Sequence, residues 1–170
     1  DEFDKIFSDL FLSNSKTYAK IVSILASGDM EAREICESLR IDQNGKMAEY
    51  LRELELSGFI KRDYTWDIKT SLDSKLSKYR LSDNYLRFYL KYIAKYKTKI
   101  DRNSFISKSL TSLEGFDTML GFSFENLVLN NRKYIYEALA LREEDIVSEN
   151  PFFQHKTSEQ LGCQIDYMIQ

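Results

Sequence analysis

The chain has 170 residues, with 24 basic and 27 acidic side chains, and hydrophobic residues make up 43% of it. This composition excludes a disordered or collagen-like chain, and the length suits one ordinary domain or two small ones. No apolar run approaches the roughly 18 residues that a membrane-spanning helix needs. We therefore expect a folded, helix-rich protein that has no membrane partner.

Residues that bind structural metals are scarce in this chain. Cys36 and Cys163 form no CxxC pair, and His155 is the single histidine. A disulfide framework and a Cys/His zinc site are therefore not expected, and a cytoplasmic location fits best. The chain begins at Asp1 and ends within a strand-like pattern, so we expect a piece of a longer protein.

The first part of the chain predicts three helices followed by a hairpin. Apolar residues recur at helical spacing in three segments, and strand-like alternation follows in two more. These segments are 17–27, 30–39 and 45–57 for the helices, and 59–67 and 77–83 for the strands, with a polar loop over 68–76. Asp42 or Asn44 can cap the third helix. This order is that of a winged helix-turn-helix, whose third helix enters the major groove of DNA.

Positive charge is concentrated between residues 61 and 99, where eleven basic side chains face four acidic ones. Such a local excess is typical of a surface that binds a polyanion, and a solvated helix face is the plainer interpretation. The residues that we predict to contact duplex DNA lie in the third helix and the hairpin; they are Asn44, Lys46, Arg52, Lys61, Arg62 and Lys69.

Three acidic residues of the third helix, Glu49, Glu53 and Glu55, have the wrong sign for a DNA-contacting helix. They favour the alternative that the winged helix packs against a protein. An aromatic stripe at helical spacing follows the hairpin. We expect it to be buried core, although aromatic residues beside lysines can also stack on bases; its members are Tyr85, Phe88, Tyr89, Tyr92 and Tyr96.

Three short motifs follow one another in a recognisable order. The run YRLSDNYLRFY covers residues 79–89, Phe124-Glu125 lies on a predicted helix, and Gln164-Ile165-Asp166 lies on a predicted strand. Together they resemble the archaeal-type ATPases of archaea and many bacteria, over roughly residues 15–170. The resemblance implies a P-loop ATPase domain before the winged helix and a region similar to PD-(D/E)XK nucleases after it.

The resemblance therefore implies an α+β chain, mainly α with a small β content, in three segments. These are a winged helix-turn-helix with an N-terminal extension (1–83), an aromatic and basic helix with a connector (84–117), and a partial restriction-endonuclease-like α/β module (118–170). No GxxxxGK[ST] motif is present, so ATP and the ATPase domain, which would be a partner, belong to the parent protein. No cofactor is expected in this piece itself.

The nuclease-like segment predicts two acidic residues in catalytic or metal-binding positions. Glu125 lies on a helix predicted over 118–140, and Asp166 lies on a strand predicted over 162–170 after another over 145–155. Carboxylates of this kind hold Mg²⁺ or Mn²⁺ in nucleases. The E-x-K element of such sites is absent, so we expect an incomplete site here. The helix is expected to bury Leu120, Phe124, Leu127, Val128, Tyr134 and Ile135, and the acidic segment 141–150 is expected to be a solvated loop.

The leading hypothesis is the non-ATPase C-terminal part of an archaeal-type ATPase, binding duplex DNA through the winged helix and the basic 61–99 block. One alternative is a divalent-metal nuclease, active in the intact parent, that uses Glu125 and Asp166. The other alternative is a protein-interaction winged helix that docks on the ATPase domain or on a partner.

Overall fold

The structure is a computed structural model that describes residue 5 and residues 15–106 and 109–170. The chain is mixed α and β, with helices predominating and two small two-stranded sheets among the described residues. It divides into two compact units, Asp1–Lys61 with Tyr79–Met119 and Arg62–Lys78 with Leu120–Gln170, and each is described by itself. The predicted α+β class is confirmed, and the division into three segments stays a prediction.

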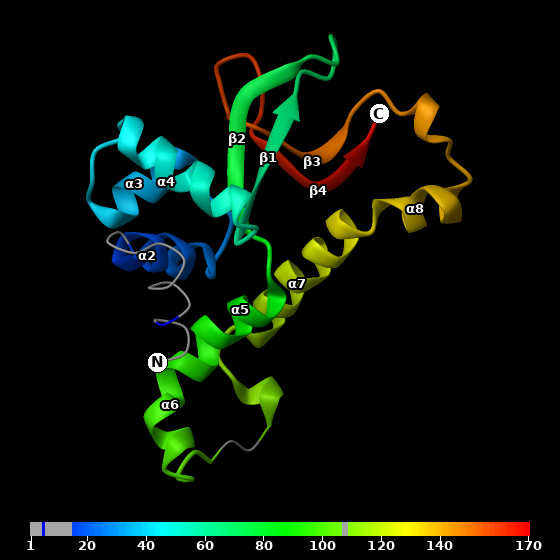
Figure 1. The fold of residues 1–170 in the computed structure, drawn as a ribbon. Helices are drawn as coiled ribbons and strands as arrows, with labels where there is room; N and C mark the ends of the chain where they lie inside the picture. Colours follow the sequence, from blue (N-terminus) through cyan, green and yellow to red (C-terminus); the bar gives the residue numbers. More distant parts are fainter. Residues whose placement is uncertain (1–4, 6–14, 107–108) are drawn as a thin grey trace. The chain divides into compact units, whose positions relative to one another are not determined.

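Three helices form most of the first unit: α2 (Ser15–Leu25), α3 (Ala32–Leu39) and α4 (Gly45–Leu56) (Figure 1). All three were predicted from the spacing of their apolar residues. In α2 and α4 the buried residues recur at i, i+3, i+4 and i+7, which places them on one face of a helix. They are Tyr18, Ile21, Val22 and Leu25 in α2, and Met47, Tyr50, Leu51 and Leu54 in α4.

Local hydrogen bonds fix the ends of α3 and α4. Glu31 and Glu34 form a reciprocal capping box at the start of α3. Asn44, one of the two predicted caps, accepts a hydrogen bond from the Met47 amide at 3.1 Å. Gly58 follows the end of α4 with φ of 78°, a left-handed conformation that a residue without a Cβ adopts at little cost.

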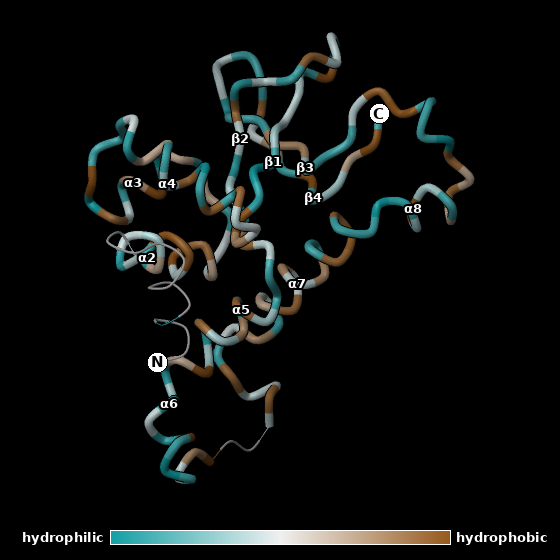
Figure 2. Tube along the Cα trace, viewed as in Figure 1, coloured by the Kyte–Doolittle hydropathy of each residue, from teal (hydrophilic) through white to brown (hydrophobic). Residues whose placement is uncertain are grey.

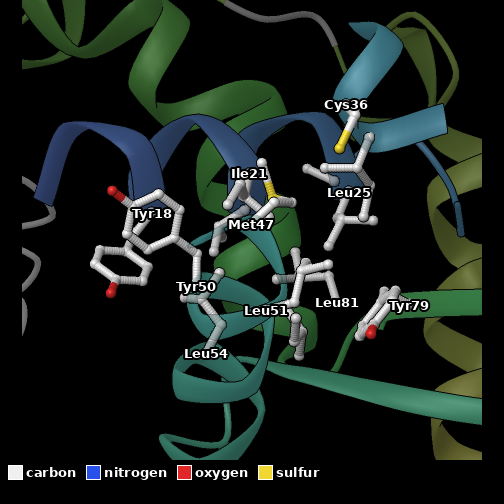
Figure 3. Close-up of a cluster of buried hydrophobic side chains, with 14 residues drawn as sticks. Tyr18, Ile21, Leu25, Cys36, Met47, Tyr50, Leu51, Leu54, Tyr79 and Leu81 are labelled. Atoms are coloured by element: carbon white, nitrogen blue, oxygen red, sulfur yellow. The ribbon is translucent and has the colours of Figure 1, made fainter. Parts of the chain in front are cut away.

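The core of the first unit gathers side chains from α2, α3, α4 and the ends of the hairpin (Figure 3). The rings of Tyr18 and Tyr50 meet edge to face with centroids 5.0 Å apart. The Tyr18 hydroxyl donates a hydrogen bond to Glu53. Burial of this hydroxyl is the main cause that raises the pKa of Tyr18, and the Glu53 carboxylate is the second. Burial also raises the pKa of the Cys36 thiol, so this cysteine is a packing residue.

The hairpin consists of β1 (Ile60–Trp66) and β2 (Asp73–Leu81). β2 begins earlier than the predicted strand, because the turn between them is tighter than the expected loop. The Asp67 carboxylate accepts hydrogen bonds from the amides of Lys69 and Thr70, which is the chemistry of an Asx turn. Near the other end, Met30 and Tyr79 exchange two backbone hydrogen bonds and attach the segment before α3 to β2.

The aromatic segment after the hairpin is not one regular helix. It consists of α5 (Asn84–Phe88), a π-helical turn η2 (Tyr89–Ile93) and α6 (Ala94–Asp101). A π-helical turn has more residues than an α-helical turn, so it rotates the faces that follow. Of the predicted core stripe, Tyr92 is buried, Tyr85 is 72% exposed, and Phe88, Tyr89 and Tyr96 are half-buried. The prediction of a buried stripe was therefore wrong for most of its members.

The helix predicted over 118–140 is two helices, α7 (Phe116–Asn130) and α8 (Arg132–Leu139), preceded by a short 3-10 turn η3 (Leu110–Ser112). The buried face was also predicted wrongly, since Leu120, Phe124, Leu127 and Tyr134 are exposed, Phe124 by 65%. Asn126, Leu129 and Tyr136 are buried instead. Residues 116–130 are apolar on several sides, so helical spacing alone does not identify the buried face.

The second sheet pairs β3 (Glu149–Gln154) with β4 (Cys163–Ile169) in antiparallel register, after a 3-10 turn η4 (Glu143–Asp145). Asn150 faces Met168 and Phe152 faces Ile165, so Pro151 is opposite two residues, Asp166 and Tyr167. This is a β-bulge. Proline has no amide hydrogen for the ladder, and an irregular position of this kind accommodates it.

Hydrophilic and hydrophobic residues mix closely along most elements, as Figure 2 shows for α2, α3 and α4. Within the described ranges, no helix combines the length and the hydropathy that crossing a membrane requires.

Candidate nucleic-acid interface

The charged side chains that β1 exposes to solvent are basic. Lys61 is exposed and Arg62 is half-exposed, whereas Asp63, the acidic residue between the basic pair and Tyr64, is buried. A basic pair that is consecutive in a strand projects to both faces of the hairpin. Burial of Asp63 removes the nearest negative charge from the surface that a phosphate would approach.

Arg62 is held in place by neighbours on the same face of the hairpin. Its Nε donates to the Ser77 hydroxyl at 2.8 Å, and its guanidinium lies 4.6 Å from the centroid of the Tyr64 ring. The side chain is half-exposed, so its positive charge lies near the surface. A preorganised arginine beside an exposed tyrosine suits phosphate or sugar contact. The sequence reasoning missed Tyr64, although the i, i+2 spacing of a strand places it beside Arg62.

A shallow groove continues this face towards the turn. It is lined by Arg62, Tyr64, Asp73, Ser74 and Lys75. Lys75 adds a second cation, and Asp73 opposes it with one negative charge. The groove therefore has a net positive lining, which suits an anionic ligand.

Lys69 lies in the turn at the end of the hairpin and is exposed. Its amide donates to the Asp67 carboxylate at 3.0 Å, so its backbone is fixed while its ammonium faces solvent. Hydrogen bonds from the Thr70 amide and hydroxyl, and then from the Lys69 amide, lower the pKa of Asp67. Asp67 is thus an anion close to Lys69, and it weakens the positive field at this end of the hairpin.

The three predicted contact residues of α4 are all exposed: Asn44, Lys46 and Arg52. The side-chain oxygen of Asn44 caps the helix, so Asn44 has a structural role. Its side-chain NH₂ group is the part that could contact a ligand. Among the opposing acids, Glu53 is half-buried under the Tyr18 hydroxyl, whereas Glu49 and Glu55 are exposed. The exposed face of α4 is consequently close to neutral.

Two members of the basic 61–99 block are not surface residues. Arg80 is buried, and Arg87 is 1% exposed. Arg87 Nη1 donates to the carbonyls of Leu25 and Ala26 at 3.2 and 3.1 Å, and Nη2 donates to the carbonyl of Leu81 at 3.3 Å. It binds the carbonyl end of α2, where the helix dipole favours a cation. The surface charge of the block is therefore smaller than the sequence count suggested.

Other residues of the hairpin, in the second unit, pack against β3 and β4. Trp66 packs edge to face on Phe152 with ring centroids 5.4 Å apart, and the Phe153 amide donates to the Thr65 hydroxyl at 3.1 Å. Lys78 lies 5.1 Å from the centroid of the Phe153 ring and donates to Gln164 at 2.8 Å. These hairpin residues are packing residues, whereas Arg62, Tyr64 and Lys75 line the shallow groove that is open to a ligand.

The predicted acidic pair lies on two elements of the second unit. Glu125 is half-buried on α7, and Asp166 is exposed on β4 at the bulge opposite Pro151. Bulges often redirect side chains beside functional sites, which is the structural feature that agrees best with the predicted role of Asp166.

The described residues do not form a complete metal site. In residues 15–106 and 109–170, no group of three or more His, Cys, Asp or Glu side chains is close enough to hold a metal ion. Nuclease sites need several oxygen ligands around each cation. Glu125 and Asp166 alone do not fit Mg²⁺ or Mn²⁺, and we derive no metal-dependent step from them.

A polar cluster that the sequence reasoning missed centres on Glu149 in the second unit. Its carboxylate accepts hydrogen bonds from Arg132 at 2.9 Å, from Tyr167 at 2.6 Å and from Tyr136. Arg132 also donates to the Asn150 side chain at 2.6 Å. We expected Glu149 to lie in a solvated loop. The available signal was the i, i+4 spacing of Arg132 and Tyr136, which places both on one face of α8.

This cluster determines the ionisation of Glu149 and its neighbours. Burial pushes the pKa of Glu149 up, but hydrogen bonds from Tyr136, Tyr167 and Arg132 outweigh burial and hold it below its usual value. Burial and the Glu149 carboxylate raise the pKa of Tyr167 and of Tyr136. Glu149 is thus held as an anion by three hydrogen-bond donors, and these bonds connect α8 to β3 and β4.

Comparisons with known proteins add one relative of unassigned role. An uncharacterized protein of Methanocaldococcus jannaschii is 30% identical over 111 residues, which are 65% of this chain and 24% of the relative. The chain thus spans about a quarter of the length of the curated relative that it matches. No family model and no solved structure matches the chain.

Proposed function

We propose that this chain is a winged helix-turn-helix followed by a nuclease-like segment, and that it binds duplex DNA as the non-ATPase C-terminal part of an archaeal-type ATPase. The order α2, α3, α4 and the β1–β2 hairpin supports the winged-helix interpretation. The three motifs of the sequence support the family, and the greater length of the relative agrees with a larger parent.

The observation that carries the proposal is the positive charge at the surface of the hairpin. Lys61, Arg62 and Lys75 project from the hairpin, while Asp63 is buried. The exposed face of α4 adds Lys46 and Arg52 but also two glutamates, so it contributes little net attraction. We infer that the hairpin supplies most of the phosphate contacts and that binding depends weakly on base sequence.

Charge reversal in β1 tests this proposal. The double variant Lys61→Glu, Arg62→Glu should weaken binding of a 20-base-pair duplex by at least tenfold and should lower the salt slope by about two, because two phosphate contacts are lost. The measurement is fluorescence anisotropy at several salt concentrations, with duplexes of unrelated sequence.

Lys133→Glu is the matched control, since Lys133 is an exposed lysine of α8 outside the hairpin. It should change duplex affinity by less than about a factor of two, as expected for a solvent-screened charge outside the interface. An equal loss in the control and the β1 variant would show a general charge effect and would contradict the hairpin interface.

Protein docking is the second candidate, and the near-neutral exposed face of α4 favours it. In this case the winged helix would bind the parent ATPase domain or a partner. In the full-length parent protein, the winged helix would then contact the ATPase domain only while α4 is intact. The 170-residue chain would not bind duplex DNA in a mobility-shift assay. Reversal at Lys46 and Arg52 distinguishes the two, because docking would be lost while hairpin-mediated duplex binding would remain.

A further inference from the structure

A second candidate binding surface lies in the first unit, at α6 and the turn that follows it. This surface, the α6 groove, has a volume of about 430 Å³. Its lining combines two aromatic rings, one lysine, two serines and two aliphatic side chains. The residues are Tyr96, Lys99, Ser104, Phe105, Ile106, Ser112 and Leu113.

The two aromatic rings of the groove come from different elements and lie together. Tyr96 of α6 and Phe105 of the turn have ring centroids 5.0 Å apart with planes tilted by 41°. Both side chains are half-buried, so each ring keeps part of its surface in solvent. Next to them Ile106 is 91% exposed. The rings thus form an accessible wall and are not sealed in the core.

Backbone hydrogen bonds build the turn that brings Phe105 back to α6. The Ser104 amide donates to the Lys99 carbonyl at 2.8 Å, and the Asn103 amide donates to the Ile100 carbonyl at 2.9 Å. Asn103 has φ of 53°, a left-handed conformation that asparagine tolerates better than most residues. The chain therefore reverses within a few residues, and the aromatic pair is held by defined geometry.

The Tyr96–Phe105 pair is separate from the buried aromatic residues that precede it in the chain. Upstream, Tyr92 is buried against Phe88 and Phe116 and donates to the Glu114 carbonyl at 3.0 Å. Tyr96, one α-helical turn further along, is half-buried and its ring meets that of Phe105.

Lys99 lines the groove, and other basic residues lie close to it in the sequence. α6 and the residue after it contain Lys95, Lys97, Lys99 and Arg102, with Asp101 as the opposing acid, and Figure 2 shows α6 as mainly hydrophilic. Lys97 is paired with Asp101 at 3.2 Å. In the part of the chain that the structure describes, Lys95, Lys99 and Arg102 have no ion-pair partner, and the Lys95 ammonium lies 5.5 Å from the centroid of the Tyr96 ring. Three cations are thus available to an anionic ligand.

We propose that the α6 groove binds single-stranded nucleic acid. An unpaired base would stack on the Tyr96–Phe105 wall, and Lys95, Lys99 and Arg102 would contact the phosphates on either side. Aromatic rings beside a cationic track are the usual components of such sites. A base inside a duplex is stacked on both faces and cannot reach this wall, so the site is distinct from the hairpin interface proposed for duplex DNA.

The test measures binding of fluorescein-labelled oligo(dT) and oligo(U) of 20 nucleotides to the 170-residue chain by anisotropy. Phe105→Ala and Tyr96→Ala should each weaken single-strand binding by about tenfold, because one stacking partner is lost. Both should leave duplex binding unchanged. Phe105→Tyr should retain single-strand binding, which separates loss of stacking from loss of folding. A preference between the two oligonucleotides would tell which sugar the groove accepts.

Tyr85→Ala is the matched aromatic control, because Tyr85 is an exposed tyrosine of α5 outside the groove. Lys61→Glu, Arg62→Glu should spare single-strand binding, so failure of the hairpin proposal and failure of this one are distinguishable. The proposal is overturned if the unmutated chain binds neither single strand or if Phe105→Ala binds as tightly as the unmutated chain. It is also overturned if the groove variants and the control variant lose equal affinity.

Discussion

At the scale of single residues, the clearest result concerns Arg87. The sequence places it in a basic block, and the resemblance includes it in the phrase LRFY, but neither tells what it does. The structure buries it against the carbonyls of Leu25, Ala26 and Leu81. Its positive charge is used within the fold, where it joins the end of α2 to the end of β2.

Arg87→Met should therefore destabilise the protein strongly while leaving its surface charge pattern intact. Three carbonyls would each lose a hydrogen bond from the guanidinium, and we expect a loss of about 3 kcal/mol in the free energy of unfolding. Urea denaturation followed by circular dichroism measures it. Arg102→Met, at an exposed arginine, should cost no more than about 0.5 kcal/mol. Equal stabilities of the two variants would contradict the role of Arg87.

Glu149 gives a second prediction at this scale, on pH. Its folded-state pKa lies below the unfolded value of about 4.3, so its stabilising contribution is complete above that value. The contribution is lost as the pH falls through the folded-state pKa. Stability should therefore fall more steeply between pH 5 and about 3 in the parent sequence than in Glu149→Gln.

The fluorescence of Trp66 reports this transition, because Trp66 is the single tryptophan and packs on Phe152 in the same unit as Glu149. Glu149→Gln should also be less stable at pH 7 by about 2 kcal/mol, since bonds to a charged acceptor are weakened. Glu143→Gln, at an exposed acid, is the control. Parallel pH curves for the parent and Glu149→Gln would exclude a role for Glu149 ionisation.

At the scale of elements, the sequence predicted the ends of helices better than their buried faces. The cap at Asn44 followed from its residue type and its place before α4. Asn44→Ala should lower the free energy of unfolding by about 1 kcal/mol, whereas Asn44→Asp should keep the cap. Thermal denaturation compares them, with Gln43→Ala as a control of the neighbouring exposed residue. A neutral Asn44→Ala would show that the cap contributes nothing.

Helix faces were predicted less well than helix ends. Spacing assumes 3.6 residues per turn throughout, and η2 breaks this assumption within the aromatic segment, so Tyr85 and Tyr92 do not share one buried stripe. In α7, apolar residues occur around the helix, and the face with Phe124 is exposed while Leu129 is buried. The break at Asn131 carries no proline or glycine, so no local signal announced it.

At the scale of the whole molecule, local patterns predicted the helices and strands of the first unit because each one has a clear apolar period and an end signal. They did not predict the contacts between distant segments. The packing of Trp66 on Phe152 and the Glu149 cluster both join residues more than ten positions apart. Such pairings depend on the tertiary fold, and no local period in the sequence encodes them.

The candidate interface shows the same division. Lys61, Arg62 and Lys69 were predicted from charge and position, and the structure places their charged groups at the surface. Arg80 and Arg87 were counted with them but are buried, since charge in a sequence does not reveal exposure. Glu125 and Asp166 remain a predicted pair, and the residues described around them do not complete a metal site.

If the chain binds duplex DNA through cationic side chains, its affinity for the duplex must fall as the salt concentration rises. Anisotropy titrations of a labelled 20-base-pair duplex between 50 and 300 mM salt would give the slope of log affinity against log salt. We predict a linear fall with a slope of about −3, as three hairpin cations release counterions. An affinity that does not change with salt, or no binding even at the lowest salt, would contradict the account.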